Sequence, residues 1–307
     1  MDLMLWRSRV WYSNRCINNS SEARAICKSI INLQREKQLM DSLKQIVETL
    51  SQAPRFDDQI IAVTGASQGI GRALALLLAA RGATIVLIAS HEDRLNQVYD
   101  EIVEAGGQTP LIVPVDFKGL TSAGAHELAD YLSDTFDRLD GLVHMAGILG
   151  GREPIQTHRP SQWEDTLQIN LTAVFHLTQA LLPLLNRAES GRVVFATSSV
   201  GYRVEAYWGA YAVSKAGLEM FAGILAKELE NTETTRVVTI NPGGTRTQMR
   251  AQAKPAENPN TLPSPDQVAE VFSFGLTPQA DSFHGQRINA RDVMAALGTW
   301  PASDSTR

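Results

Sequence analysis

The chain has 307 residues, enough for one large α/β domain or two smaller ones. Its formal net charge is −5 and no long basic stripe occurs, which argues against nucleic acid as a partner. Only Cys16 and Cys27 are present, both near the N-terminus. This excludes a disulfide framework or a cysteine metal site in the rest of the chain and fits a cytoplasmic location. We predict no metal site and no membrane span, because runs such as Ala73–Ala80 are too short to cross a bilayer.

Residues 1–53 are predicted to be an extension, poorly ordered or helical, before a single catalytic domain of residues 54–307. Residues 1–39 contain seven Lys/Arg against three acids, a composition also typical of transit peptides. No apolar core of about 7–15 residues marks a secretory signal. We favour a plain extension, or sequence upstream of a start at Met40, over a targeting segment.

From Asp57 onward, short β-branched runs alternate with longer helical runs. In chain order we predict a strand at 59–63, a helix at 70–81, a strand at 84–89, a helix at 92–105, a strand at 111–115, a helix at 123–136, a strand at 141–145, a helix at 163–186, a strand at 192–197, a helix at 207–229 and a strand at 236–240. Such alternation indicates an α/β fold with one doubly wound, Rossmann-type parallel sheet of about seven strands, with helices on both faces.

The first predicted strand is followed by the loop Thr64–Gly71, whose glycines are spaced G-x-x-x-G-x-G. Glycines can form a tight turn and let the backbone approach a pyrophosphate, which then lies at the N-terminus of the next helix. Three glycines can also make a simple turn, but the position between strand and helix favours dinucleotide binding. The predicted cofactor contacts in this loop are Gly65, Ser67, Gln68, Gly69, Ile70 and Gly71.

The end of the second predicted strand bears on the choice of cofactor. An acid there would bind the ribose 2′-hydroxyl of NAD. The chain instead has Ser90 and His91, with Arg94 nearby and no acid before Glu92. These residues could admit a 2′-phosphate, so we favour NADP. Alternatively, Ser90 only caps the following helix.

Residues after the third and fourth strands complete the predicted cofactor site. Asp116 could accept a hydrogen bond from the adenine amino group, although a turn or capping aspartate would look the same. Ala146 and Gly147 are small residues along which a cofactor can pass closely.

A candidate catalytic group follows the fifth strand. Tyr211 and Lys215 are four residues apart on a predicted helix, so they share one face and could point toward Ser198 at the strand end. A nearby ammonium lowers the pKa of a tyrosine from its usual value of about 10 and makes it a better acid or base. We therefore predict a lowered pKa for Tyr211. The alternatives are an exposed i,i+4 pair and a turn-forming serine.

These features resemble the short-chain dehydrogenase/reductase family over roughly residues 57–290. The residues that carry the resemblance are the Thr64–Gly71 loop, Met145-Ala146-Gly147, Asn170, Ser198, Tyr211, Lys215 and Asn241-Pro242-Gly243. The chain is most similar to a bacterial branch of oxidoreductases in this family, on the basis of Trp208–Tyr211 and Asn241–Thr247.

The resemblance implies hydride transfer between a nicotinamide cofactor and a carbonyl or alcohol substrate. Tyr211 would be the proton donor, Ser198 would polarise the carbonyl, and Asn170 would hold a water that links Lys215 to solvent. It also implies a homodimer or homotetramer formed through the helix that carries Tyr211. Further cofactor contacts would come from Tyr211, Lys215, Pro242, Gly243, Thr245 and Thr247.

The chain departs from the family pattern at three places. Many NADP-dependent members have a basic residue before the second glycine of the loop or after the second strand, where this chain has Gln68 and Ser90, so the choice between NAD and NADP stays open on this point. It has His144-Met145 where the family usually has Asn-Asn, which puts the local backbone order in doubt. It also has Asn289–Asp292 where a Gly-Gly turn is common, so the end of the sheet is expected to differ.

The segment after Gly243 corresponds to the family's variable substrate loop, and Arg246, Arg250 and Lys254 follow one another at intervals of four residues. This trio could meet an anionic substrate such as a carboxylate or a phosphopantetheine thioester. We favour the alternative of a solvated loop helix. On the anionic hypothesis, Arg246→Ala would raise the Michaelis constant for anionic substrates only.

Two other functions are compatible with parts of the pattern. An epimerase or dehydratase uses the same tyrosine and lysine, but usually has Gly-x-x-Gly-x-x-Gly and a larger C-terminal domain. A regulatory protein could hold NAD(P)H without turnover, although the intact Ser198, Tyr211 and Lys215 argue against it.

Overall fold

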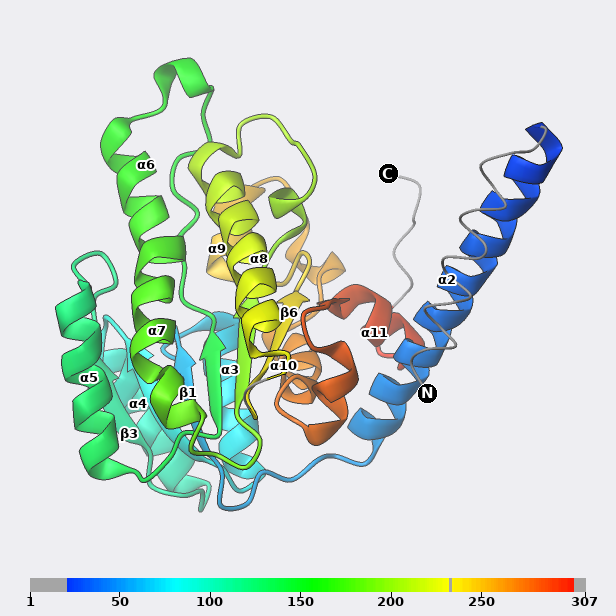
Figure 1. The fold of residues 1–307 in the computed structure, drawn as a ribbon. Coiled ribbons are helices and arrows are strands. Elements are labelled where there is room, and N and C mark those ends of the chain that lie inside the picture. The colour runs from blue at the N-terminus through cyan, green and yellow to red at the C-terminus, as the bar shows by residue number, and fades with distance from the viewer. Residues whose placement is uncertain (1–20, 232–233, 301–307) are drawn as a thin grey trace. The chain divides into compact units, whose positions relative to one another are not determined.

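The computed structural model describes residues 21–231 and 234–300 (Figure 1). The chain divides into two compact units, residues 1–46 and 47–307. Helix α2 (Ser21–Ser51) contributes to the first unit. In the described parts of the chain, no helix is long and apolar enough to cross a membrane. The domain boundary predicted at residue 53 stays a prediction.

A single parallel sheet of seven strands forms the centre of the second unit. The strand order is β3-β2-β1-β4-β5-β6-β7, so the direction of winding reverses between β1 and β4. The strands are β1 (Ile60–Thr64), β2 (Thr84–Ala89), β3 (Leu111–Pro114), β4 (Gly141–His144), β5 (Arg192–Ala196), β6 (Arg236–Asn241) and β7 (Arg287–Asn289). The predicted fold class is confirmed, and each of the six strands assigned from sequence agrees to within one residue at either end.

Helices cover both faces of the sheet, and α7 and α8 lie in front of it in Figure 1. On that face α5 packs on α7 and α6 on α8, while α3 contacts α4 and α10 elsewhere in the unit. The helices are α3 (Gly69–Ala80), α4 (Glu92–Glu104), α5 (Ser122–Thr135), α6 (Pro160–Leu167), α7 (Ala173–Leu185), α8 (Gly209–Leu229), α9 (Gln248–Ala253), α10 (Pro265–Phe274) and α11 (Ala290–Ala296). Short 3-10 helices are η1 (Ile155–Thr157), η3 (Ser199–Gly201), η4 (Pro259–Thr261) and η5 (Pro278–Phe283).

The helix predicted at 163–186 is instead two α-helices joined by a π-helical turn, η2 (Gln168–Thr172). The turn is centred on Asn170, which is completely buried. Its side-chain oxygen accepts a hydrogen bond from the Ile148 amide at 2.8 Å, and its side-chain nitrogen donates to the Ile148 carbonyl at 2.9 Å. Such π-helical turns are frequent at functional sites. The apolar periodicity continues through the turn and therefore did not reveal it.

The end of the sheet is formed by Asn289, and its departure from the family pattern stays a prediction. This residue ends β7, and its side-chain oxygen accepts a hydrogen bond from the Asn241 side-chain nitrogen at 3.2 Å. Asn241 also donates to the Tyr202 hydroxyl at 3.0 Å. Side chains thus join the ends of β6 and β7.

The apolar core contains one buried histidine. His144 ends β4, stacks on Phe195 with 5.0 Å between ring centroids, and its Nε2 lies 2.8 Å from the Thr178 hydroxyl. Burial, reinforced by the charge of Lys215, lowers the pKa of His144 to about 3. The imidazole is therefore neutral in the folded protein at any ordinary pH.

We predict that His144→Asn makes the protein less sensitive to acid. Between pH 6.5 and about 3 the unfolded chain protonates this histidine and the folded protein does not, so the free energy of unfolding falls as the pH falls. The contribution is at most about 1.4 kcal/mol per pH unit. Urea unfolding from pH 7 to 4 should show a shallower loss for the variant. The exposed His126→Asn on α5 is the control, and equal slopes for wild type and His144→Asn would contradict the prediction.

Candidate active site

A cleft of about 360 Å³ lies at the carboxyl ends of the central strands. This is where ligands bind in open parallel sheets, next to the reversal of winding. Most of the residues predicted to bind a cofactor line it: Gly65, Ser67, Gln68, Gly69, Ile70, Gly71, Ser90, Asp116, Ala146, Gly147, Tyr211, Lys215, Pro242 and Thr247. Gly243 and Thr245 line a neighbouring cavity instead.

The glycine loop brings β1 and α3 into unusually close contact. Gly65 has φ +67°, and a Cβ built there would lie 3.0 Å from the backbone of Ala146. A Cβ at Gly71 would overlap the Gly65 carbonyl oxygen. The Thr64 hydroxyl accepts hydrogen bonds from the amides of Met145 and Ala146, each at 3.0 Å. The loop therefore presents the N-terminus of α3, with its free N–H groups, to the cleft.

The part of the cleft at the end of β2 carries the polar groups predicted to favour NADP. Ser90 and His91 line it, and Arg94 Nη1 donates to the Gln68 side-chain oxygen at 2.9 Å. Arg94 thus lies against the glycine loop. Asp116 lines the cleft too, but its carboxylate also accepts from the Lys118 amide at 3.0 Å, so the turn-forming role is present as well.

Asn170 is tied into the site through its side chain. Besides its pairing with Ile148, it donates to the Ser214 hydroxyl on α8 at 3.1 Å. A Cβ at Gly147 would lie 3.1 Å from Asn170 Oδ1 and 3.8 Å from Lys215 Nζ, so all three residues meet there. The side chain of Asn170 is satisfied by protein groups, and only its helix backbone is left for the predicted water.

Lys215 and Tyr211 meet on α8, as the spacing predicted. Lys215 Nζ lies 5.9 Å from the centroid of the Tyr211 ring and donates to the Ala196 carbonyl at 2.8 Å. Burial lowers the pKa of Lys215 to about 8, although the charge of Glu219 opposes the shift. Lys215 is buried, which excludes the alternative that Tyr211 and Lys215 form an exposed i,i+4 pair.

The pKa of Tyr211 departs from its prediction. Burial raises it, and this effect exceeds the lowering caused by a hydrogen bond with Ser198 and by the charge of Arg250. The prediction of a lowered pKa was therefore wrong for the protein alone. The sequence places the ammonium of Lys215 near the phenol, but it does not show that burial removes water from around the phenol.

A second cavity of about 280 Å³ adjoins the cleft and shares Tyr211 with it. Ser198, the predicted polarising hydroxyl, lines this cavity and not the cleft. Its apolar wall is a cluster formed by Leu149, Val200, Trp208 and Ala253. None of these wall residues was predicted, because their apolar side chains look like ordinary core residues in the sequence.

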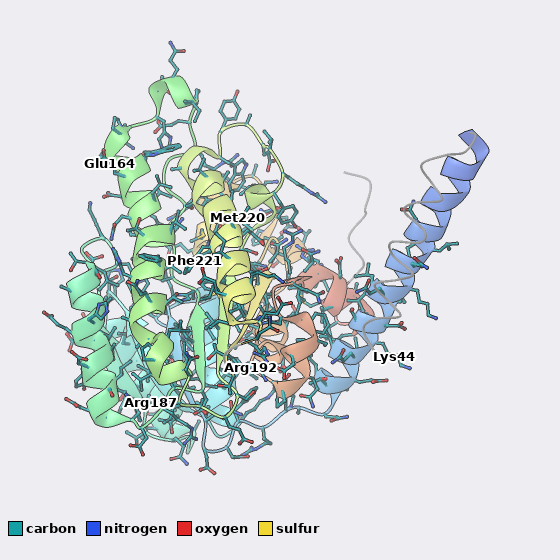
Figure 2. All side chains as sticks on the ribbon, in the orientation of Figure 1. Lys44, Glu164, Arg187, Arg192, Met220 and Phe221 are labelled. Atoms are coloured by element: carbon teal, nitrogen blue, oxygen red, sulfur yellow. The ribbon has the colours of Figure 1, made fainter. Side chains whose placement is uncertain are left out.

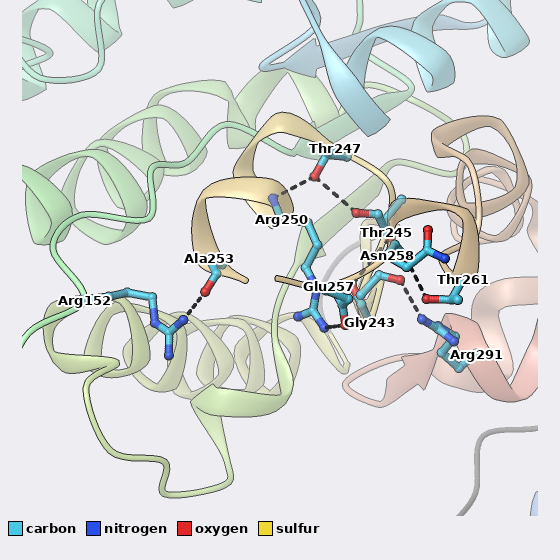
Figure 3. A network of polar contacts seen from close by, with 11 residues as sticks. Arg152, Gly243, Thr245, Thr247, Arg250, Ala253, Glu257, Asn258, Thr261 and Arg291 are labelled. Carbon is cyan, nitrogen blue, oxygen red and sulfur yellow. Dashed lines mark hydrogen bonds and ion pairs between the residues drawn. The ribbon is translucent and has the colours of Figure 1, made fainter. Parts of the chain in front are cut away.

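Arg152 joins the two segments that border this cavity, and it too was missed. Its guanidinium lies 4.5 Å from the centroid of the Trp208 ring and donates to the Ala253 carbonyl at the end of α9 (Figure 3). The contact combines a cation–π interaction with a backbone hydrogen bond. No sequence motif contains both partners, which lie 101 residues apart.

The residues present fit a dinucleotide. The cleft has a helix N-terminus for the pyrophosphate, and the buried Thr197 hydroxyl at its inner end has no hydrogen-bond partner within the described residues. In the same part of the chain, no cluster of His, Cys, Asp or Glu could hold a metal ion. The fold and this arrangement define a Rossmann-type nucleotide-binding protein with a tyrosine–lysine site.

Comparison with known proteins narrows this class. Residues 59–258 match the model of the short chain dehydrogenase family. The uncharacterized oxidoreductase YciK of Escherichia coli K12 is 44% identical over 217 residues, which cover 71% of this chain and 85% of that protein. A short chain dehydrogenase of Shigella flexneri, solved with NADP, is 42% identical with a TM-score of 0.75 and covers 77% of this chain and 98% of its own. One of Escherichia coli, solved with NADPH, is 41% identical with the same TM-score, covering 78% and 98%.

The chain therefore belongs to the short-chain dehydrogenase family, and it is an oxidoreductase of that family. The resemblance noted in the sequence, including that to a bacterial branch, is confirmed. The cofactors in the two solved relatives agree with the NADP favoured from the end of the second strand.

We predict that Gly71→Ala weakens cofactor binding by about tenfold or more. The added methyl group overlaps the Gly65 carbonyl oxygen, so the loop must move away from its present position. Titration with NADPH, followed by fluorescence, measures the dissociation constant. The control is Gly223→Ala on α8, where a Cβ meets nothing within 4 Å. Wild-type affinity in Gly71→Ala would disprove the role of the close contact.

Proposed function

We propose that the protein transfers hydride between NADP(H) and a carbonyl or alcohol substrate, with Tyr211 as general acid and base. The observation that carries the proposal is the position of Tyr211, which lines both the cleft and the second cavity. Tyr211 shares a hydrogen bond with Ser198, and Lys215 Nζ lies 5.9 Å from the centroid of the tyrosine ring. A carbonyl in the second cavity would thus be within reach of both the cofactor and the phenol.

The roles of the side chains follow from their positions. NADPH supplies the hydride when bound. Ser198 donates a hydrogen bond that polarises the carbonyl oxygen, and Tyr211 gives that oxygen its proton. Lys215, held by the Ala196 carbonyl, keeps its positive charge near the phenol and stabilises the phenolate that remains. Asn170 fixes the backbone through which a water would connect Lys215 to solvent.

NADP is supported as the cofactor by chemistry at the end of β2. Ser90 and His91 offer hydrogen-bonding groups, and Arg94 offers a charge that suits a 2′-phosphate. The first acid after this strand is Glu92 in the first turn of α4. The two solved relatives bound to NADP and NADPH give independent support.

A non-catalytic NADP-binding protein remains the alternative of a different class. It would need the same cleft but would not need Tyr211, Ser198 and Lys215 together. An epimerase or dehydratase is less well supported, since the glycine spacing of the Thr64–Gly71 loop and the single-sheet unit match the short-chain dehydrogenase family.

We propose that the protein forms a homodimer or homotetramer through α7 and α8. Exposed apolar side chains gather there: Phe175 on α7, and Val213, Met220 and Ile224 on α8. Figure 2 shows Met220 and Phe221 on the front of the ribbon, on the face that α7 and α8 share. Several large apolar side chains on one surface are typical of an interaction site.

We predict that Tyr211→Phe lowers kcat for NADPH-dependent carbonyl reduction by about 10²-fold or more, because the proton donor is lost. NADPH binding should stay within about threefold of wild type. Stopped-flow or steady-state loss of NADPH absorbance, together with a fluorescence titration, separates the two effects. Tyr131→Phe on the exposed face of α5 is the control. Full activity of Tyr211→Phe would rule out the mechanism, and inactivity of wild type across a broad carbonyl panel would favour the binding protein.

We predict that Arg94→Ala weakens NADPH binding by about tenfold and leaves NADH binding unchanged, because a guanidinium–phosphate contact is lost. Dissociation constants for both cofactors test this. The control is Arg187→Ala, an exposed residue after α7 that Figure 2 labels. An equal loss of affinity for NADH would mean that Arg94 supports the glycine loop through Gln68 and does not bind the 2′-phosphate.

We predict that Met220→Glu shifts the protein toward monomer, since a charge would be buried in an apolar interface. Size-exclusion chromatography with light scattering measures the mass. Val103→Glu, an equally polar change at an exposed apolar residue on α4, should leave the assembly intact. A monomeric wild type, or an unchanged mass for Met220→Glu, would refute the proposed interface.

A further inference from the structure

The second cavity holds charged groups that the proposed function does not use. Arg250 and Lys254 line it from α9 and the residue after α9, and the exposed Glu205 lines it from the loop before α8. Arg246, the third member of the basic trio in the sequence, is exposed and does not line the cavity. The three cations therefore differ in position. Arg250 is the one that is half-buried beside the active site.

Arg250 is held in a fixed orientation with part of its guanidinium free. Its Nε and Nη2 donate to the two oxygens of Glu257 at 2.6 and 2.7 Å (Figure 3). Its guanidinium also lies against the backbone of Gly244, where an added Cβ would be 3.0 Å from Cζ. Nη1 has no hydrogen-bond partner within the described residues. A guanidinium that is already ordered loses little conformational entropy when it binds a ligand.

The charges around Glu257 remain positive overall. Arg250, Lys254 and Arg291 all lower the pKa of this carboxyl group, the hydrogen bond from Arg250 most strongly. Three cations thus surround one acid, and including Glu205 still leaves an excess of one positive charge. Glu257 fixes Arg250 in place without neutralising the whole group.

The positive charge and the reacting hydroxyl belong to the same cavity. Arg250 is close enough to Tyr211 for its charge to act on the phenol. The apolar wall that includes Leu149, Val200 and Trp208 lines the same cavity and packs against Tyr211. A molecule with a carbonyl at one end, a hydrocarbon part in the middle and an anion at the other end would satisfy all three surfaces.

We propose that the substrate is a carbonyl compound that carries a carboxylate, and that the free Nη1 side of Arg250 binds this carboxylate while Tyr211 and Ser198 meet the carbonyl. The hydrocarbon part lies against Trp208. This inference rests on the proposed function, since it names the substrate class of the same site. Arg250 is then the residue that determines specificity, with Lys254 at the cavity wall adding to its charge.

The test compares an acid and a neutral molecule of nearly the same shape. The substrates are 4-formylbenzoate and 4-formylbenzamide, reduced with NADPH by the full-length protein. We expect wild type to have a KM for the acid about tenfold or more below that for the amide, and Arg250→Gln to lose this preference. Arg250 also influences Tyr211, so its replacement could change catalysis for both substrates. The readout is therefore the ratio of the KM for the acid to the KM for the amide, which a change common to both substrates does not alter.

Three variants separate anion binding from damage to the loop. Glu257→Gln should keep the preference for the acid, since the loss of a competing carboxylate offsets the weaker fixation of Arg250. The double variant Arg250→Gln/Glu257→Gln leaves no unpaired acid behind and should still lose the preference. Arg246→Ala, on the same loop but outside the cavity, should keep it. An equal KM for the two aldehydes in wild type, or an equal loss for both in Arg250→Gln, would overturn the proposal.

Calorimetric binding to the NADP-loaded protein distinguishes the failure of this inference from that of the proposed function. The probes are 4-methylbenzoate and 4-methylbenzamide, neither of which can be reduced. If neither aldehyde is turned over but 4-methylbenzoate binds about tenfold more tightly, and only when Arg250 is present, the anion site stands and hydride transfer fails. If both aldehydes are reduced without preference and both probes bind alike, hydride transfer stands and the carboxylate site fails.

Discussion

The buried side chain of Asn170 holds the reaction centre together, because it joins three segments that are far apart in the sequence. It pairs with both backbone groups of Ile148 after β4 and donates to Ser214 on α8. A buried amide must satisfy its polar atoms within the protein, and here each of these bonds also positions a functional segment. Without it, the loop that carries Gly147 and the helix that carries Lys215 would share no polar contact at this point.

The same pairing is made from within the π-helical turn between α6 and α7, because Asn170 is its central residue. Such turns are frequent at functional sites. Leu177 and Leu181, one and two turns later, return to the regular pattern of buried positions.

Much of the fold could be read from the sequence because the strands of a parallel sheet are nearly continuous apolar runs. The spacing of Tyr211 and Lys215 was equally informative, since a helix places i and i+4 on one face. What could not be read depends on contacts across the fold. Gly243 and Thr245 line the second cavity and not the predicted cofactor cleft. The stacking of Arg152 on Trp208 joins segments that are distant in the sequence. The raised pKa of Tyr211 depends on burial, which a helical pattern does not measure.

The two adjacent glycines after β6 have a consequence for how specificity could change within this branch of the family. An added Cβ at Gly243 would lie 3.0 Å from the side chain of Arg291, and one at Gly244 would lie 3.0 Å from Arg250. Each missing side chain thus makes room for a guanidinium. A single alanine at residue 244 would crowd the Arg250 guanidinium and shift it by a few tenths of an ångström, while leaving the arginine itself in the sequence. Position 244 could then alter the electrostatic character of the cavity without any change of a charged residue, so a comparison of charged residues alone would overlook it.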